Sequence, residues 1–386
     1  MVFSLKMYIE VYRDVVEDAI DKSGYEVNLS LDLLQLLAVF SSRGNHIVSV
    51  PCLVNNKALT QKLSTVMGSI SVRKLRRYDT SFYKLQTIKQ DLLKYCIVTY
   101  SSSNMSDERA IVYNPTRMQR FEPYLQTKLI TENILDAYFF DYIAHFYLRE
   151  KRFTGGVEII FEATPGGGST TCDVVRHEIL ENRRFCLVIV DGDKKCPGQT
   201  EYGDTARKII NVINQYPSEV CNHYIMEKVM EVENLIPQRI VKKYASEKNN
   251  CDVLDRDVSY YDMKVGLTLK GLYNDDVFNY QSKIFPDLDF TQRDEAKGNT
   301  TCRDEYEQYI EEHHLANVLK KGFGSDLLKN VTCACDGKGR IRYPELKNEM
   351  KNKIISKDLT ADQLEEWNHI GQLMFSWMCG LPSKYY

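Results

Sequence analysis

The sequence lacks the features of several large classes of protein. Its most aromatic stretch, AYFFDYIAHFYL, is too short to cross a bilayer and contains Asp141 and His145. It has no internal repeat and no low-complexity segment. The stretch MVFSLKMYIEVYRDVVEDAI shows no secretory leader, and the eleven cysteines follow no regular spacing. We therefore expect a soluble cytoplasmic protein with reduced thiols and no membrane contact.

The chain also lacks an excess of charge of one sign. It carries 50 Lys and Arg residues against 53 Asp and Glu residues, which gives a net charge of −3. This balance excludes a protein that binds nucleic acid by bulk charge alone. Only residues 51–100 have a sizeable basic excess, with nine basic and two acidic side chains. The length of 386 residues and the apolar fraction of 43% predict a globular chain of two or three domains.

Residues 1–120 are predicted to form a helical region with one β-hairpin. Residues 31–40 are an apolar helix, and Asn56 is placed to cap a second helix before a third, basic one. The runs YCIVTY and RAIVYN around a polar loop predict the hairpin. This order is typical of a winged helix-turn-helix, whose third helix enters the major groove, although an ordinary solvated helix face stays open as the alternative. The predicted nucleic-acid contacts are Arg73, Lys74, Arg76, Arg77 and Lys84.

The composition changes after a helical connector predicted over residues 121–152. VEIIFEA and FCLVIV are short apolar strands, separated by the loop TPGGGS and a helix. Because FCLVIV is continuously apolar, it is expected to be buried on both faces of a parallel sheet. We therefore predict an α/β domain over 153–295. Residues 296–386 are expected to be helical, with Trp367 and Trp377 on an apolar face that packs on the α/β domain or forms a homo-oligomer interface.

Acidic side chains fall at the ends of these two predicted strands. Glu162 lies at the carboxyl end of VEIIFEA, directly before the glycine loop, and Asp191 and Asp193 follow FCLVIV. Because ligands bind outside the carboxyl ends of parallel strands, we expect these carboxylates to lie close together. Oxygen ligands without histidine or cysteine suit Mg²⁺ or Mn²⁺ rather than zinc. Such a site supports metal-assisted phosphoryl transfer.

A strand that ends in Glu before a glycine loop, followed by a strand that ends in Asp-x-Asp, resembles the TOPRIM domain of topoisomerases, primases and nucleases. The likeness is greatest to nucleases of the OLD (overcoming lysogenization defect) type and related stand-alone antiphage proteins. MEVENLIP at 230–237 is similar to their Glu-x-Glu-Asn-aliphatic run, and YYDMKVGL at 260–267 to their later Asp-x-Lys-x-Gly segment. The resemblance covers about residues 155–270.

The resemblance implies a metal-dependent nuclease that cleaves DNA or RNA in prokaryotic antiphage defence. Glu162 would also serve as general base, and Lys264 would stabilise the developing phosphate charge, a role for which Lys194 is a second candidate. The chain contains no Walker A sequence, so an NTPase would have to be a separate partner subunit. The implied ligands of Mg²⁺ or Mn²⁺ are Glu162, Asp191, Asp193 and Glu233.

The spacing departs from the family pattern in one respect. Only 28 residues separate Glu162 from Asp191, whereas a standard TOPRIM domain has room there for a further strand and helix. The domain would therefore be abridged, or Glu158, on the same predicted strand face, would replace Glu162.

Three other interpretations stay open. VIVDGDKK also resembles the first motif of haloacid-dehalogenase-type phosphatases, which usually have Thr or Val where Lys195 stands. A non-catalytic DNA-binding regulator would use the same acids only for solubility. A zinc site is a poor match to the usual ligand spacing, and reduced structural cysteines are the simpler interpretation. The ligands of such a zinc site would be Cys302, Cys333 and Cys335 with His313 or His314.

Overall fold

The computed structural model divides the chain into two compact units, each discontinuous in sequence. Unit 1 comprises residues 1–189, 209–224 and 368–386, and unit 2 comprises residues 190–208 and 225–367. None of the described helices combines the length and the apolarity that a membrane span requires. The structure describes residues 7–24, 27–42, 46–77, 82–101, 107–116, 121–123, 125–153, 157–244, 248–332 and 344–380.

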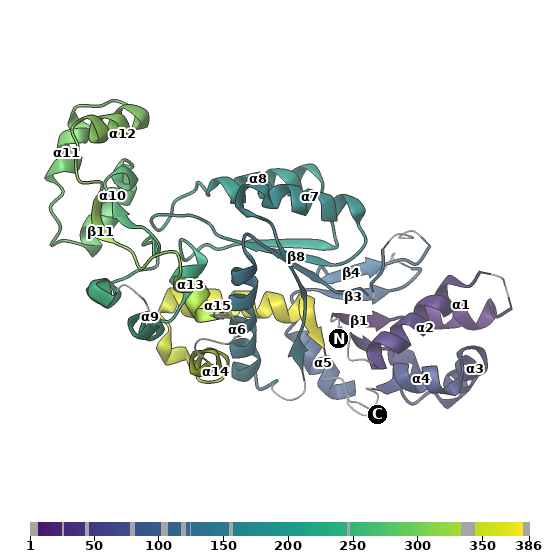
Figure 1. Ribbon diagram of the computed structural model, residues 1–386. Coiled ribbons are helices and arrows are strands. Elements are labelled where there is room, and N and C mark those ends of the chain that lie inside the picture. The colour runs from purple at the N-terminus through teal and green to yellow at the C-terminus, as the bar shows by residue number, and fades with distance from the viewer. Residues whose placement is uncertain are drawn as a thin grey trace, which may run out of the picture. The chain divides into compact units, whose positions relative to one another are not determined.

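Unit 1 begins with a four-stranded sheet in the order β2-β1-β3-β4 (Figure 1). All of its pairings are parallel, and both central strands are fully buried. Glu10 is the one charged residue of these two strands, and its carboxylate forms an ion pair with Lys89 at 2.9 Å. Its strands are β1 (Tyr8–Val11), β2 (Ile47–Ser49), β3 (Tyr95–Val98) and β4 (Ala110–Tyr113). The accompanying helices are α1 (Arg13–Asp21), α2 (Leu29–Ser42), α3 (Lys57–Met67), α4 (Ser69–Leu75) and α5 (Phe82–Gln90).

The predicted hairpin in this region is wrong. β3 and β4 run parallel. The prediction failed because an apolar pattern indicates burial and carries no information about strand direction. The predicted basic helix is also divided, into α4 and α5. Where the winged helix was predicted, the described residues form a parallel sheet with helices. The apolar helix is confirmed as α2, and so is the cap, since the Asn56 side chain accepts the Leu59 N–H at 3.1 Å.

A second four-stranded sheet of unit 1 has the order β7-β5-β8-β9. β5 pairs in parallel with both of its neighbours, and β8 is buried along its whole length, as FCLVIV predicts. One helix, α6, lies on one face, and α7 and α8 lie on the other (Figure 1). The strands are β5 (Lys128–Thr131), β7 (Glu162–Pro165), β8 (Cys186–Val190) and β9 (Cys221–Ile225). The helices are α6 (Ile134–Glu150), α7 (Thr171–Glu181) and α8 (Asp204–Gln215).

The two sheets repeat one strand order. In each, the first strand in the chain is central, the second lies on one side of it, and the third and fourth lie on the other side. This order creates a topological switch point between the first and third strands, and ligands of open α/β sheets bind at such points. The switch points are those between β1 and β3 and between β5 and β8.

Aromatic side chains join the two sheets within unit 1. Phe121 contacts Tyr113 of β4 at a ring distance of 5.5 Å and Phe185 at 4.8 Å. Phe185, the residue before β8, meets Trp377 of α15 (Ala361–Met378) at 6.0 Å. Trp367 and Trp377 are both fully buried, which confirms the predicted apolar face of this helix.

Three segments differ from the strands and helices that their sequences predict. The predicted connector contains β5, the central strand of the second sheet. VEIIFEA is divided, because β6 (Glu158–Ile159) leaves the sheet and pairs with β12 (Cys379–Gly380). IMEKVMEVENLIP is not a strand, because β9 ends at Ile225. Backbone N–H groups beyond it donate hydrogen bonds to a side chain. Glu366 Oε1 accepts the N–H groups of Glu227 (2.8 Å) and Lys228 (2.7 Å).

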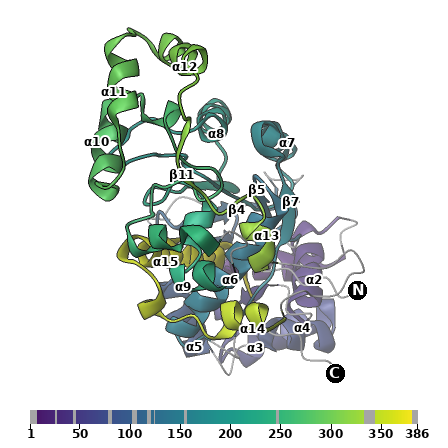
Figure 2. The ribbon, with the colours of Figure 1, turned by 60° about the vertical axis from the view of Figure 1, so that its left-hand side comes forward.

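Unit 2 is mostly helical, as predicted for its carboxy-terminal part. Its antiparallel ribbon consists of β10 (Gly266–Thr268) and β11 (Val318–Lys321). Figure 2 shows α10, α11 and α12 gathered in one group, in which Leu269, Ala296 and Tyr306 form a buried cluster. The helices are α9 (Gln238–Tyr244), α10 (Asp275–Ile284), α11 (Thr291–Gly298), α12 (Arg303–Glu312), α13 (Leu327–Thr332) and α14 (Pro344–Asn352), with the 3₁₀ helix η4 (Val232–Leu235) before them.

The packing of α15 on α6 can be tested at Gly371. A Cβ there would lie 2.4 Å from the Cβ of Tyr147, so Gly371→Ala is expected to destabilise the protein by about 1–3 kcal/mol. Gly298→Ala is the matched control, because a Cβ at the end of α11 meets nothing within 4 Å. Thermal unfolding should show a lower Tm for the first variant only. Equal Tm values for the two variants would contradict this packing.

Candidate functional site

The Asp191-Gly192-Asp193 loop follows the last residue of β8 directly and is fastened by its own polar atoms. Asp191 Oδ1 accepts the N–H of Val232 at 2.9 Å. The N–H of Asp193 donates to the carbonyl of Met230, also at 2.9 Å. The loop is therefore held against the segment MEVENLIP.

Two glycines allow this loop to pack closely. A Cβ at Gly192 would lie 2.2 Å from the carbonyl oxygen of Met226, and one at Gly203 would lie 2.0 Å from Asp193 Oδ2. The N–H of Gly203 donates to the carbonyl of Gly192 at 3.0 Å. Asp193 itself has a φ of 53°, in the left-handed region that few non-glycine residues adopt. The surrounding contacts thus impose the position of the Asp193 carboxylate.

MEVENLIP brings two further carboxylates to the same unit. Glu231 and Glu233 flank Val232, and only 5% and 3% of their surfaces are exposed. Glu231 Oε1 accepts the N–H of Met263 at 3.1 Å. Asn234 Nδ2 donates to the carbonyls of Val258 (2.6 Å) and Tyr261 (2.7 Å), which locks the run in place. The sequence singled out Glu233; the alternation Glu-Val-Glu was the signal for Glu231.

The ammonium group of Lys264 lies between these two carboxylates. Its Nζ lies 2.8 Å from Glu231 Oε2 and 3.2 Å from Glu233 Oε2. Although Glu233 Oε2 is within ion-pair distance, it is buried and forms no hydrogen bond with any described residue. Asp262 Oδ1 accepts the N–H groups of Lys264 (3.0 Å) and Val265 (2.7 Å), which shapes the turn that presents Lys264.

The cluster holds more carboxyl groups than cations, and burial raises the pKa of several of these carboxyl groups. Burial raises the pKa of Asp193, and the charge of Lys264 opposes this rise. Burial, and then repulsion from Glu233, raise the pKa of Glu231 to about 8. Burial disfavours the charged form of Lys264, but the carboxylates of Glu231 and Glu233 outweigh it and raise the pKa of Lys264. Asp191, Asp193, Glu231 and Glu233 thus each interact electrostatically with Lys264, and Lys195 is a second cation near Asp193. Asp262 adds a further carboxylate near Asp193 and Glu231.

Glu162 does not end its strand, so this part of the prediction is wrong. It begins β7, where it pairs with Lys128, and Lys128 pairs in turn with Cys186, the first residue of β8. Glu162 therefore lies at the amino ends of these parallel strands, because VEIIFEA is divided between β6 and β7. Its Oε2 accepts a hydrogen bond from Arg184 at 2.6 Å. Glu158 is exposed and lies on β6, outside this sheet.

Besides Asp191 after β8, a second acid directly follows a strand of this sheet, namely Glu132 after β5. The N–H of Gly166 donates to the carbonyl of Thr131 (2.7 Å), and the N–H of Gly167 donates to that of Glu132 (3.0 Å). These amides of the glycine loop therefore hold β5 rather than a phosphate. Sequence reasoning missed Glu132 because the short run LIT was assigned to a helical connector. Its position directly before the Asn133 helix cap was the available signal.

Other predicted site residues are engaged elsewhere or lie outside the described part. The Lys194 ammonium forms an ion pair with Glu227, and the residue is 8% exposed. His313 stacks on Tyr309 at a ring distance of 3.8 Å. Cys333 and Cys335 lie outside the described residues, so the zinc interpretation stays a hypothesis.

The carboxylate cluster offers the oxygen donors that a hard divalent cation prefers, and it contains more carboxyl groups than cations. Within the described ranges, however, no three His, Cys, Asp or Glu side chains are arranged to hold one metal ion. Lys264 already compensates Glu231 and Glu233. Coordination by three side chains would therefore require the carboxylates to move closer together.

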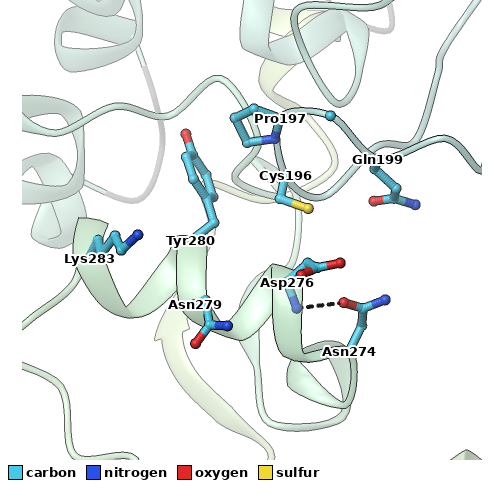
Figure 3. Close-up of a pocket in the computed structure, with 9 residues that line it drawn as sticks. Cys196, Pro197, Gln199, Asn274, Asp276, Asn279, Tyr280 and Lys283 are labelled. Carbon is cyan, nitrogen blue, oxygen red and sulfur yellow. Dashed lines mark hydrogen bonds between the residues drawn. The ribbon is translucent and has the colours of Figure 1, made fainter.

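The loop that carries Asp193 continues into a pocket of about 300 Å³ that extends along α10 (Figure 3). Asp276 and Lys283 contribute one charge of each sign, and the rest of the lining is uncharged. The pocket therefore has no surplus of positive charge that would select a phosphate. Its residues are Cys196, Pro197, Gly198, Gln199, Asn274, Asp276, Asn279, Tyr280 and Lys283.

The charge state of Glu231 can be tested through the pH dependence of stability. Because its folded-state pKa is raised to about 8, the folded state binds a proton that the unfolded state releases at lower pH. The corresponding stability is complete below the ordinary range of a glutamate and is lost as the pH rises through about 8. The Tm of the wild type should therefore fall between pH 5 and pH 9, each pH being an approximate bound of the scan.

Glu231→Gln should flatten this decline, because the amide does not titrate. Asp276→Asn removes an exposed carboxylate of the same unit and should leave the decline unchanged. Thermal unfolding followed by circular dichroism provides the measurement. Parallel curves for the wild type and Glu231→Gln would show that Glu231 does not carry the shifted proton.

Comparisons with known proteins add no assignment to this geometry. No family model matches the sequence, and no matching curated protein or solved structure was found.

Proposed function

We propose that this chain is a metal-dependent nuclease that hydrolyses phosphodiester bonds of DNA or RNA. The observation that carries the proposal is the Asp191-Gly192-Asp193 loop, which emerges at the carboxyl end of a buried parallel strand and is fastened to a carboxylate-rich segment. Loops at that end of a strand are the usual place for ligands in α/β proteins. The sequence resemblance to TOPRIM nucleases supports the same chemistry.

The charge of the cluster supports a bound cation. Asp191, Asp193, Glu231 and Glu233 share Lys264 as a counter-charge. Glu233 also has a buried oxygen without a hydrogen bond among the described residues. An Mg²⁺ or Mn²⁺ ion held by Asp191, Asp193 and Glu233 would compensate the excess of carboxyl groups. It would also give the buried oxygen of Glu233 a partner. When bound, such an ion polarises the phosphate and increases the acidity of a water molecule. In this proposal the three side chains bind and orient the ion.

Lys264 has a separate role in the proposal. Its raised pKa keeps the ammonium charged at any working pH, and 37% of its side chain is exposed, so it can face a substrate. A fixed positive charge of this kind stabilises the negative charge that develops on a phosphate in the transition state. Lys194 is not assigned this role, because Glu227 already pairs with it.

The partner and the biological setting rest on the resemblance alone. The chain has no Walker A sequence, and we propose that the NTPase associated with nucleases of this type is supplied by a separate subunit. Antiphage defence is proposed on the same basis. Glu162 is left out of the proposed site because of its place at the start of β7 and its bond to Arg184.

The nuclease activity can be tested by incubating the purified protein with plasmid, linear DNA and RNA in the presence of Mn²⁺. Asp191→Asn/Asp193→Asn should reduce cleavage at least about 100-fold, because it removes two proposed ligands. Glu162→Gln and Asp276→Asn are controls that should cleave like the wild type, and Glu132→Gln asks whether the acid after β5 contributes. Equal cleavage by the wild type and the double variant would refute the proposal.

Metal binding has an independent readout in thermal stability. Saturating Mn²⁺ should raise the Tm of the wild type, with a gain of about 2.7 kcal/mol at one hundred times the Kd. The gain should be larger at pH 8 than at pH 6, both taken as approximate, since protons compete with the ion for Asp193 and Glu233, whose pKa values are raised by burial. Asp276→Asn should keep the gain. Its persistence in Asp191→Asn/Asp193→Asn would place the ion elsewhere.

A further inference from the structure

A cationic groove lies in unit 1, where α4 packs beside α2 and α3. It has a volume of about 890 Å³, and its lining includes four basic side chains and no acidic one. Hydroxyl groups make up most of the remaining polar lining. We call it the α4 groove. Its residues are Ser42, Thr60, Ser64, Ser69, Ile70, Val72, Arg73, Lys74, Arg76 and Arg77.

Two arginines of the α4 groove are positioned by backbone and hydroxyl oxygens. Arg77 Nη1 donates to the carbonyls of Ser41 (3.0 Å) and Ser42 (2.8 Å), which ties the end of α4 to the end of α2. Arg76 Nη1 donates to Thr60 Oγ1 of α3 at 3.4 Å. The groove therefore has walls from three helices, with guanidinium groups fixed between them.

The other two cations are not neutralised by the described part of the protein. Neither Arg73 nor Lys74 forms an ion pair or a side-chain hydrogen bond with a described residue, and Arg73 is exposed. The surrounding segment, residues 51–100, has nine basic and two acidic side chains, so no local surplus of acids compensates them. Such a concentration of one sign of charge in a concave surface attracts a polyanion.

We propose that the α4 groove binds the phosphodiester backbone of a nucleic acid without reading its bases. Cations and hydroxyl donors are the groups that contact phosphates. Arginine can also read guanine through both arms of its guanidinium, but Arg76 and Arg77 each already donate from Nη1 to a protein oxygen. No amide side chain, the usual reader of adenine, lines this groove. The proposal deepens the proposed nuclease function by naming the surface that holds the substrate. It replaces the recognition helix of the predicted winged helix with a groove that recognises charge.

The proposal predicts how binding depends on salt. Arg73→Gln/Lys74→Gln removes two phosphate contacts, so affinity should fall about tenfold or more, to the same degree for unrelated sequences. Each lost contact should also reduce the slope of log affinity against log salt by about 1. Lys57→Gln/Lys62→Gln removes the same charge from the neighbouring helix α3, but these lysines do not line the α4 groove. This control should keep most of the affinity and most of the slope.

The measurement is fluorescence anisotropy of labelled duplex DNA and single-stranded RNA, each in two unrelated sequences, at several salt concentrations. Chelator is present and all proteins carry Asp191→Asn/Asp193→Asn, so that binding is scored without cleavage. A cleavage assay on the otherwise wild-type protein tests the nuclease proposal separately. Circular dichroism tests whether Arg73→Gln/Lys74→Gln and Lys57→Gln/Lys62→Gln are folded.

Specific loss of affinity in Arg73→Gln/Lys74→Gln for DNA, RNA or both would support the α4 groove, and the two labelled probes identify which nucleic acid it holds. Three results would overturn the proposal. One is equal loss in both pairs of variants, which would show a bulk charge effect. The others are absence of binding to all four probes, and tighter binding to vesicles that contain anionic lipid than to any nucleic acid.

Discussion

One ammonium group, that of Lys264, pairs with two buried carboxylates of unit 2. Glu231 and Glu233 are almost completely buried, and each lies within ion-pair distance of Lys264 Nζ. Removal of a cation from such a pair leaves uncompensated buried charge, which costs far more than a surface ion pair contributes. The segment that carries both glutamates also binds Asp191 through the Val232 N–H. The position of the Asp-Gly-Asp loop therefore depends on this charge balance.

The two sheets of unit 1 share a strand order but differ at their edges. At the switch point of the first sheet, Asp14 Oδ2 accepts hydrogen bonds from Thr99 Oγ1 (2.6 Å) and the Tyr100 N–H (2.9 Å). These two donors at the strand ends are therefore already engaged by the protein itself. In the second sheet, Glu132 follows β5 and the Asp191 loop follows β8. The same topology thus carries different chemistry, because function resides in the loops at the strand ends.

Local patterns predicted local structure well and pairing poorly. FCLVIV became β8, and Asn56 caps its helix, because continuous burial and capping depend on residues close together in the chain. The direction of β3 and β4 was wrong, since alternation of apolar side chains is the same in parallel and antiparallel pairs. β5 was missed because the short run Leu-Ile-Thr before Glu132 does not distinguish a short central strand from a helix start.

The sequence by itself determined that acids follow a buried strand and that a second acidic run, MEVENLIP, lies farther along the chain. The basic surplus of residues 51–100 was also readable from composition. Only the tertiary structure decided that Lys264 pairs with Glu231 and Glu233, that Glu162 begins its strand, and that four basic residues line one groove. These facts depend on strand register and on contacts between distant segments. Such long-range pairings leave no periodic trace in the sequence.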